Sequence, residues 1–246
     1  KEILYVYASH DMEPSLGCDR MDRYHVFSTE DMKTWTDHGE IMNAATVRKQ
    51  AGWGSEGFMW APDCAYNPED QLYYFYFPHP ENTQNWNSTW RIGVAVSRYP
   101  DKEFTVVGYV KGMMPFIDPC VFVDDDGQPY IYNGGGGSCY GAKLSRNNWT
   151  KLASQPVRME GLEDFHEATW VHKYNDRYYL SHSDNNSPSK GGNMMRYAVS
   201  DSPLGPWESL GAYMYPQGVE TNHGSIVNFK GKWYAFYHTA NYSGNG

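Results

Sequence analysis

Four polar residues lie at matching distances before aromatic segments of the chain, and they are the first candidates for chemistry. They stand ten to twelve residues before an aromatic run, and they are Asp63, Asp118, Glu167 and His223. Three carboxyl groups and an imidazole at equivalent positions are typical of general acid–base chemistry, in which one group gives a proton and another accepts one. The matching spacing predicts that the four side chains share one pocket.

A repeat of strands would position this pocket. Five aromatic-rich segments begin roughly every fifty to seventy residues, a spacing typical of propeller blades, and they cover residues 5–7, 73–76, 130–132, 178–180 and 233–237. Four of them are followed by a second strand that ends in Ser, and then by a Trp or Phe that marks a further strand. About four strands in each of five units predict an all-β fold, the five-bladed β-propeller. The innermost strand of each blade lines the axis, where the four polar residues would converge.

The repeat is expected to be incomplete at both ends of the sequence. The position ten to twelve residues before the first aromatic segment falls upstream of Lys1, and two further strands would follow Gly246. We therefore expect residues 1–246 to form a single propeller domain. Its first blade would lack the inner strand, and its last blade would lack the outer strands.

Composition narrows the class of partner. The net charge of −9 over 246 residues argues against nucleic acid, because no basic stripe exists to neutralise phosphates. No apolar run approaches the length of a membrane span, and no signal peptide is recognised, so no membrane partner is expected. The oligomeric state stays open.

Aromatic residues make up 16% of the sequence, which is a high share. About two-thirds of them are expected to pack strands against one another. The surplus suits a sugar-binding cleft, because flat ring faces meet the C–H groups of a pyranose or furanose. Together with Asp63, the candidates for substrate binding are the aromatic residues just before axial positions, namely Trp53, Phe58, Trp60 and Phe116.

Three other patterns have structural interpretations. The four cysteines lack the close paired spacing of a zinc site, and their disulfide state stays open. The glycine run 134–137 lacks the Lys-Ser/Thr that follows it in a phosphate-binding loop, so we expect a flexible loop near the pore. Residues 124–127, Asp-Asp-Asp-Gly, are expected to form a hairpin turn.

Several short strings, taken in their order and spacing, resemble glycoside hydrolase family 43. They are Trp-Ala-Pro-Asp at 60–63, Ile-Asp-Pro at 117–119, Phe-His-Glu-Ala at 165–168 and Asn-His-Gly-Ser-Ile-Val at 222–227. Residues 7–11 and 31–35 are similar to the family as well, so the resemblance covers almost the whole chain. It implies an inverting hydrolase with three axial carboxylates.

The resemblance also implies roles for these residues. The general acid falls on Glu167, and the Asp that orients it and tunes its pKa falls on Asp118. His223 matches the histidine beside a pore-bound metal or water. The resemblance implies no required cofactor and allows a calcium ion in the central pore. The family's general base, an Asp in the inner strand of blade one, falls upstream of Lys1, and Asp11 is the nearest substitute.

The chemistry explains why these groups are wanted. Inversion needs an acid on the leaving oxygen and a base that activates water on the opposite face, with the two carboxyl groups about 6.5–9.5 Å apart. A neighbouring negative charge such as Asp118 would raise the pKa of the acid, so that it keeps its proton near neutrality.

The resemblance implies cleavage of α-L-arabinofuranosyl or β-D-xylosyl linkages in plant cell-wall oligo- or polysaccharides, by a secreted or periplasmic bacterial protein. Two alternatives remain at this point. One is a noncatalytic carbohydrate-binding propeller that lacks a base. The other is a related five-bladed hydrolase that acts on galactan or fructan. The sequence leaves exo and endo action open.

Overall fold

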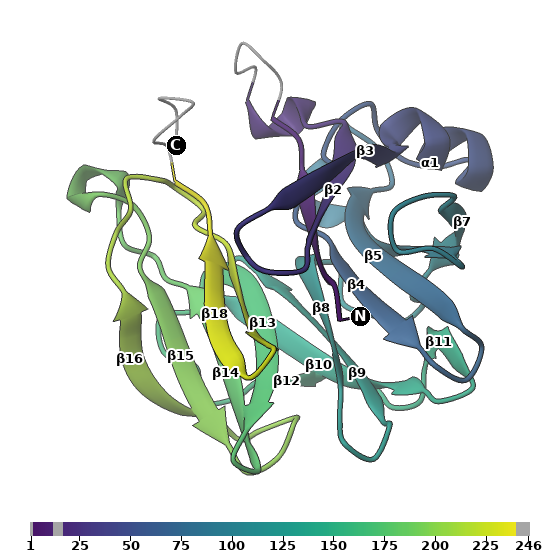
Figure 1. Ribbon diagram of the computed structural model, residues 1–246. Helices are drawn as coiled ribbons and strands as arrows, with labels where there is room; N and C mark the ends of the chain where they lie inside the picture. The colour runs from purple at the N-terminus through teal and green to yellow at the C-terminus, as the bar shows by residue number, and fades with distance from the viewer. Residues whose placement is uncertain (1, 12–16, 240–246) are drawn as a thin grey trace. The chain divides into compact units, whose positions relative to one another are not determined.

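The computed structural model describes residues 2–11 and 17–239. Within these residues the chain forms eighteen β-strands, one α-helix and three short 3-10 helices (Figure 1). All pairs of strands within the sheets are antiparallel. The fold is therefore all-β and propeller-like, a series of small antiparallel sheets, as the sequence predicts at this level.

The strands follow one another from sheet to sheet along the chain. The first sheet holds β1 (Leu4–Ser9), β2 (Arg23–Thr29) and β3 (Trp35–Asn43). The next holds β4 (Asp63–Asn67), β5 (Leu72–Pro80), β6 (Trp90–Ser97) and β7 (Thr105–Tyr109). The third holds β8 (Ile117–Val123), β9 (Pro129–Gly135), β10 (Ser138–Ser145) and β11 (Asn148–Leu152), with the short β12 (Val157–Arg158) paired to β10. Then come β13 (Glu167–Tyr174), β14 (Arg177–Ser183), β15 (Met195–Ser200) and β16 (Glu208–Met214), and last β17 (Gly224–Phe229) with β18 (Lys232–Tyr237).

An aromatic segment forms the second strand of its sheet wherever the first strand begins at or beside one of the four polar candidates. Residues 73–76 lie in β5, and residues 130–132 lie in β9, which is buried at each of its seven positions. A strand covered on both faces reads as a continuous apolar run rather than an alternating one. This explains why the repeat is visible in the sequence, and it confirms the predicted strands and the four-strand unit.

The glycine run 134–137 is a correction to the sequence prediction. Gly134 and Gly135 belong to the buried strand β9, and Gly135 pairs with Ser138 across a two-residue turn. Both turn residues, Gly136 and Gly137, have positive φ, at 57° and 86°. Two positive φ angles are what a tight hairpin turn requires, so this is a hairpin turn and not a flexible loop.

One α-helix, α1 (Ala44–Ala51), lies between the first two sheets and was not expected. The side chain of Asn43 caps its N-terminus by accepting the N–H of Thr46, and Gly52 ends it in the left-handed conformation. At eight residues it is about two turns long. No helix of the described residues is long and apolar enough to cross a membrane.

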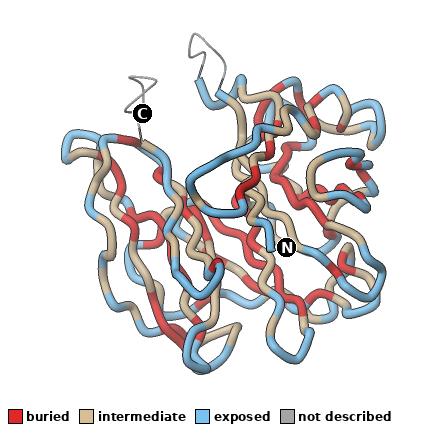
Figure 2. Tube along the Cα trace, in the orientation of Figure 1, coloured by how far each residue is buried: buried red, intermediate tan, exposed pale blue. Residues whose placement is uncertain are grey.

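Residue contacts divide the chain into two compact units, Lys1–Pro119 with Trp149–Lys151, and Cys120–Asn148 with Leu152–Gly246. Each unit has its own core, and Figure 2 shows buried positions following the strands. The first core is centred on Tyr24, Phe75 and Phe77, all fully buried. The second core includes the fully buried Tyr132 and Leu180. The four cysteines are free thiols.

Candidate functional site

Asp118, the predicted tuning residue, is the second residue of β8 and lies in the first unit. It is 3% exposed, and its φ of 54° lies in the left-handed region that non-glycine residues rarely adopt. Such strain often marks functional positions, where the surrounding structure enforces it. The strain at Asp118 therefore agrees with a functional role for this carboxylate.

Tyr24 connects the surroundings of Asp118 to Trp60. Its pKa is raised well above the usual value, first by burial and then by the charge of Asp118, so the phenol keeps its proton. The hydroxyl donates a hydrogen bond to the backbone carbonyl of Trp60, at 2.7 Å. A residue of the first sheet thus holds the backbone of Trp60 in place.

Asp63, the other acid of this unit, is the first residue of β4 and pairs with Tyr76 of β5. It is partly buried, and its Oδ1 accepts the backbone N–H of Cys64 at 2.8 Å. Counting back from the aromatic segment therefore located Asp63 at the start of the first strand of its sheet, three residues after Trp60.

Phe58 and Trp60 come together in an aromatic cluster that also contains Trp86 and Trp90. The ring of Phe58 stacks on Trp86 with centroids 5.5 Å apart, and Trp60 lies 4.7 Å from Trp90. Trp86 is 39% exposed, so this cluster presents one indole to solvent. Phe58 itself has a φ of 62°, a costly conformation for an aromatic residue. Sequence reasoning missed Trp86 and Trp90, although two tryptophans four residues apart at the end of a polar loop were a signal.

Trp53 lies in a different aromatic group of the same unit. Its ring stacks on Phe77 at 6.3 Å and 8°, and meets Tyr109 edge-on at 6.2 Å. Phe116 is partly buried directly before β8, and its N–H donates to the Met114 carbonyl. The structure thus groups Phe58 with Trp60 and groups Trp53 elsewhere.

Glu167, the predicted acid, lies in the second unit as the first residue of β13. Its side chain is only 15% exposed. The pairing with β14 shifts register between Glu167 and Trp170, and Ala168 has a φ of 63°. A bulge of this kind re-aims a side chain at the end of a strand, and bulges are common next to active sites.

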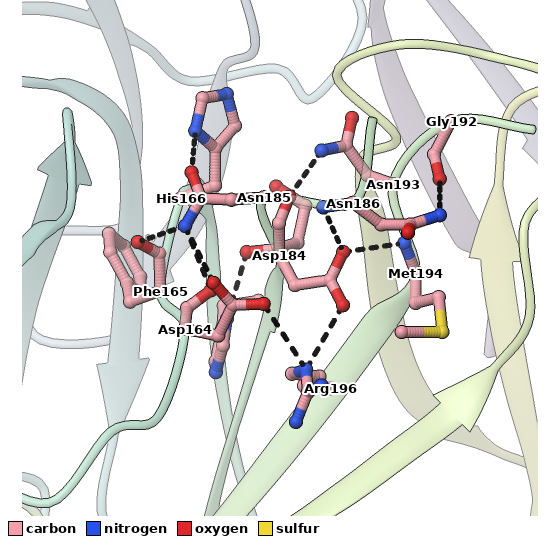
Figure 3. Close-up of polar contacts among 12 residues, drawn as sticks. Asp164, Phe165, His166, Asp184, Asn185, Asn186, Gly192, Asn193, Met194 and Arg196 are labelled. Atoms are coloured by element: carbon pink, nitrogen blue, oxygen red, sulfur yellow. Dashed lines mark hydrogen bonds and ion pairs between the residues drawn. The ribbon is translucent and has the colours of Figure 1, made fainter. Parts of the chain in front are cut away.

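A line of polar contacts begins at Glu167. Nε2 of His166 lies 3.7 Å from Oε2 of Glu167. Nδ1 of His166 lies 2.9 Å from Oδ1 of Asn185, and Figure 3 shows this contact. The amide nitrogen of Asn185 donates to Oδ1 of Asp164 at 2.9 Å. The loop after β14 is therefore tied to the residues that precede the candidate acid.

The line ends at a buried ion pair. Asp184 is fully buried, and its Oδ2 accepts a hydrogen bond from Nε of Arg196 at 3.0 Å. Its Oδ1 accepts the backbone N–H groups of Asn186 and Met194, at 3.0 and 2.9 Å. Nε of Arg196 also lies 3.9 Å from Asp164. Every oxygen of this buried carboxylate is thus satisfied, which makes the loop a firm support.

His223 directly precedes β17, and its backbone N–H donates to Nδ1 of His238 at 3.3 Å. Burial lowers the pKa of the His223 imidazole to about 4, so the ring is neutral near pH 7. The part of the chain that the structure describes contains no group of three or more His, Cys, Asp or Glu side chains that could hold a metal ion.

A propeller-like all-β fold, a mostly buried carboxyl group at a bulged strand start and, in the first unit, a partly exposed aromatic cluster are features typical of carbohydrate-active proteins of the glycosidase class. Comparison with known proteins gives the family. The family model described as glycosyl hydrolases family 43 matches residues 2–246. The chain belongs to this family, and the resemblance noted in the sequence is confirmed.

Named relatives and solved structures agree. The chain is 34% identical to "Xylosidase/arabinosidase 43A" of Humicola insolens, over 96% of the chain and 84% of that protein. It is 31% identical to a "Xylosidase/arabinosidase" of Bacteroides ovatus, over 96% of the chain and 82% of that protein. A solved family 43 β-xylosidase/α-arabinofuranosidase from a compost microbial metagenome, in complex with xylotriose and calcium-free, superposes with a TM-score of 0.83 at 32% identity, covering 98% of the chain and 83% of that structure.

Proposed function

We propose that the protein is an inverting glycoside hydrolase that cleaves α-L-arabinofuranosyl or β-D-xylosyl linkages in plant cell-wall polysaccharides. The observation that carries the proposal is Glu167, a mostly buried carboxyl group at a bulged strand start with a histidine beside it. A carboxyl group withdrawn from water keeps its proton more readily, which a general acid requires. The names of the relatives favour these two sugars.

In the proposed reaction Glu167 protonates the leaving glycosidic oxygen, and Asp118 takes the tuning role that the family resemblance implies for it. A second carboxylate activates water on the opposite face of the sugar, as inversion requires. Within the described residues, Asp11 and Asp63 are the carboxylates to test for that role. Asp11 is exposed and lies two residues after the end of β1, whereas Asp63 is partly buried at the start of β4.

The sugar would bind against aromatic faces and polar groups of the first unit. We assign this role to Asp63, Phe58, Trp60, Phe116 and Trp53, with His223 of the second unit near the pore. The partly exposed ring of Trp86 extends the set, because it stacks on Phe58. The reaction needs no cofactor, since carboxyl groups supply both proton transfers. A calcium ion in the central pore would be additional to this set of binding residues.

We further propose that the sheets are blades of one five-bladed propeller domain. Five consecutive antiparallel sheets, each made of strands adjacent in sequence, support this architecture. A small propeller would give the wide separation of carboxyl groups that an inverting site needs.

The test is a panel of nitrophenyl α-L-arabinofuranoside, β-D-xyloside and β-D-galactoside together with arabinoxylan. Turnover of the first two and an inverted product anomer by NMR are expected. The Glu167→Gln variant should lose at least 10²-fold in rate on the polysaccharide and less on nitrophenyl substrates, whose leaving group needs little protonation. Glu163→Gln is the matched control, because it removes an exposed carboxylate four residues earlier. Equal losses for Glu167→Gln on both kinds of substrate would exclude the acid role.

A further inference from the structure

We infer that Asn185 and His166 act as a positioning pair for the general acid: Asn185 selects the imidazole tautomer whose unprotonated Nε2 faces the carboxyl group of Glu167. This inference rests on the proposed acid role of Glu167. It adds two residues to the reaction, neither of which needs to touch the substrate.

The orientation of the Asn185 amide is set by its neighbours. Its Nδ2 faces three oxygen acceptors, Oδ1 of Asp164 at 2.9 Å and the backbone carbonyls of Asp164 and Phe165 at 3.4 Å each. An amide nitrogen can only donate, so three acceptors on this side place the NH₂ group there. The amide oxygen therefore points to His166.

The amide oxygen in turn decides the protonation of the imidazole. Oδ1 of Asn185 can only accept, so Nδ1 of His166, at 2.9 Å, must carry the proton. In the neutral ring the other nitrogen, Nε2, then holds a lone pair. This nitrogen lies 3.7 Å from Oε2 of Glu167.

A lone pair toward Glu167 favours the protonated acid. At 3.7 Å the two atoms are too far apart for a hydrogen bond, so the dipole of the neutral ring acts on the carboxyl group electrostatically. The electron-rich Nε2 disfavours a carboxylate and favours a neutral carboxyl group, which keeps the proton for the leaving oxygen. The opposite tautomer, with N–H at Nε2, would stabilise the carboxylate and so favour the loss of the proton from Glu167. Selection of the tautomer therefore matters to the reaction.

Asn185 is held on its amide side by Asp164. The carboxylate of Asp164 also lies 3.9 Å from Nε of Arg196, which binds the buried Asp184. The ring of His182 lies 5.1 Å from that of Phe165. The charged groups that the structure links to the pair, directly or through Asp164, are thus Glu167, Asp164, Arg196 and Asp184.

The first experiment reads the tautomer directly. Nitrogen-15 NMR of histidine-labelled protein at pH 7 to 8 should show His166 with a protonated Nδ1 and an unprotonated Nε2. Asn185→Ala should remove this preference, and Asn186→Ala should keep it. Asn186 is a matched control, since its side chain binds the carbonyl of Gly192 and not the imidazole. A wild-type ring protonated at Nε2 would overturn the inference whether or not the protein is an enzyme.

The second experiment reads the consequence for the acid. In Asn185→Ala, the basic limb of the pH profile of kcat/KM should move to lower pH by at least about half a unit, and the rate on arabinoxylan should fall about tenfold, within the range for general-acid assistance. His166→Ala should behave alike, and adding Asn185→Ala to it should change nothing further, because Asn185 acts through His166. Additive effects, or an unmoved basic limb, would overturn the inference. Absence of wild-type turnover on every substrate would instead refute the proposed function.

Discussion

The buried ion pair between Asp184 and Arg196 gives the sharpest stability prediction. Oδ2 of Asp184 lies 3.0 Å from Nε of Arg196, inside the second unit. The Asp184→Asn change keeps the shape, and the amide oxygen can still accept the N–H groups of Asn186 and Met194. It also turns an NH₂ group toward the guanidinium, so a largely buried cation loses its near anion.

The size of the effect follows from burial. Removing one partner of a buried ion pair costs about 3–5 kcal/mol of the free energy of unfolding. The Arg196 side chain keeps 21% exposure, and Asp164 stays at 3.9 Å, which offsets part of the loss. We therefore expect Asp184→Asn to cost about 3 kcal/mol. Asp184→Ala should cost about 2 kcal/mol more, because two backbone N–H groups also lose their acceptor.

The assay is urea unfolding followed by tryptophan fluorescence and circular dichroism. Asp201→Asn is the matched control, because Asp201 lies at the same 3.0 Å from Nε of Arg177 but is 88% exposed. Exposed pairs contribute little, so this variant should unfold like the wild type. Equal losses in the two Asn variants would refute the reasoning that burial, and not geometry, sets the value of the pair.

Three further outcomes are expected. Gly161→Ala should cost about 3 kcal/mol of the free energy of unfolding, since a methyl group there would overlap the Trp207 carbonyl at a φ of 92°; Gly211→Ala, at 94° with open space, should cost about 1, and equal costs would contradict this. Burial lowers the pKa of His79 to about 4, so below pH 6.5 the unfolded chain takes up a proton that the folded chain refuses. The free energy of unfolding should thus fall from pH 7 to pH 5, by on the order of 2 kcal/mol from this residue. Urea titrations at the two pH values should show a correspondingly smaller fall for His79→Gln. Trp86→Ala should raise KM for xylo-oligosaccharides about threefold to tenfold and leave KM for nitrophenyl xyloside unchanged; an equal change in both would place the ring outside the binding surface.

Counting back from the aromatic strands placed the candidate acids well, because burial on both faces makes those strands readable. Asp63 and Glu167 are the first residues of β4 and β13, and Asp118 is the second residue of β8. His223 lies one residue before β17, a small shift from the expected strand. The individual strands could be located because each sheet follows the same short path of chain.

The residues that hold the loop beside the candidate acid could not be predicted from the sequence. Asp184 and Arg196 look like ordinary surface charges in the sequence, and only the fold of the loop after β14 buries the carboxylate. The left-handed conformations of Asp118 and Ala168 have no glycine or asparagine to announce them. Helix α1 was different: Asn43 and Gly52 are ordinary start and stop signals, but eight residues are too few for a clear helical period.

The order of strands has a consequence for how the protein is made. Within each sheet the strands pair with their neighbours along the chain, apart from β12, which pairs with β10. Pairing of this kind closes only short loops, so it loses little conformational entropy and is fast. During synthesis each sheet can begin to form once its own strands have left the ribosome, before the later sheets exist. For the sheets of the described residues, the order of synthesis and the order of assembly then coincide.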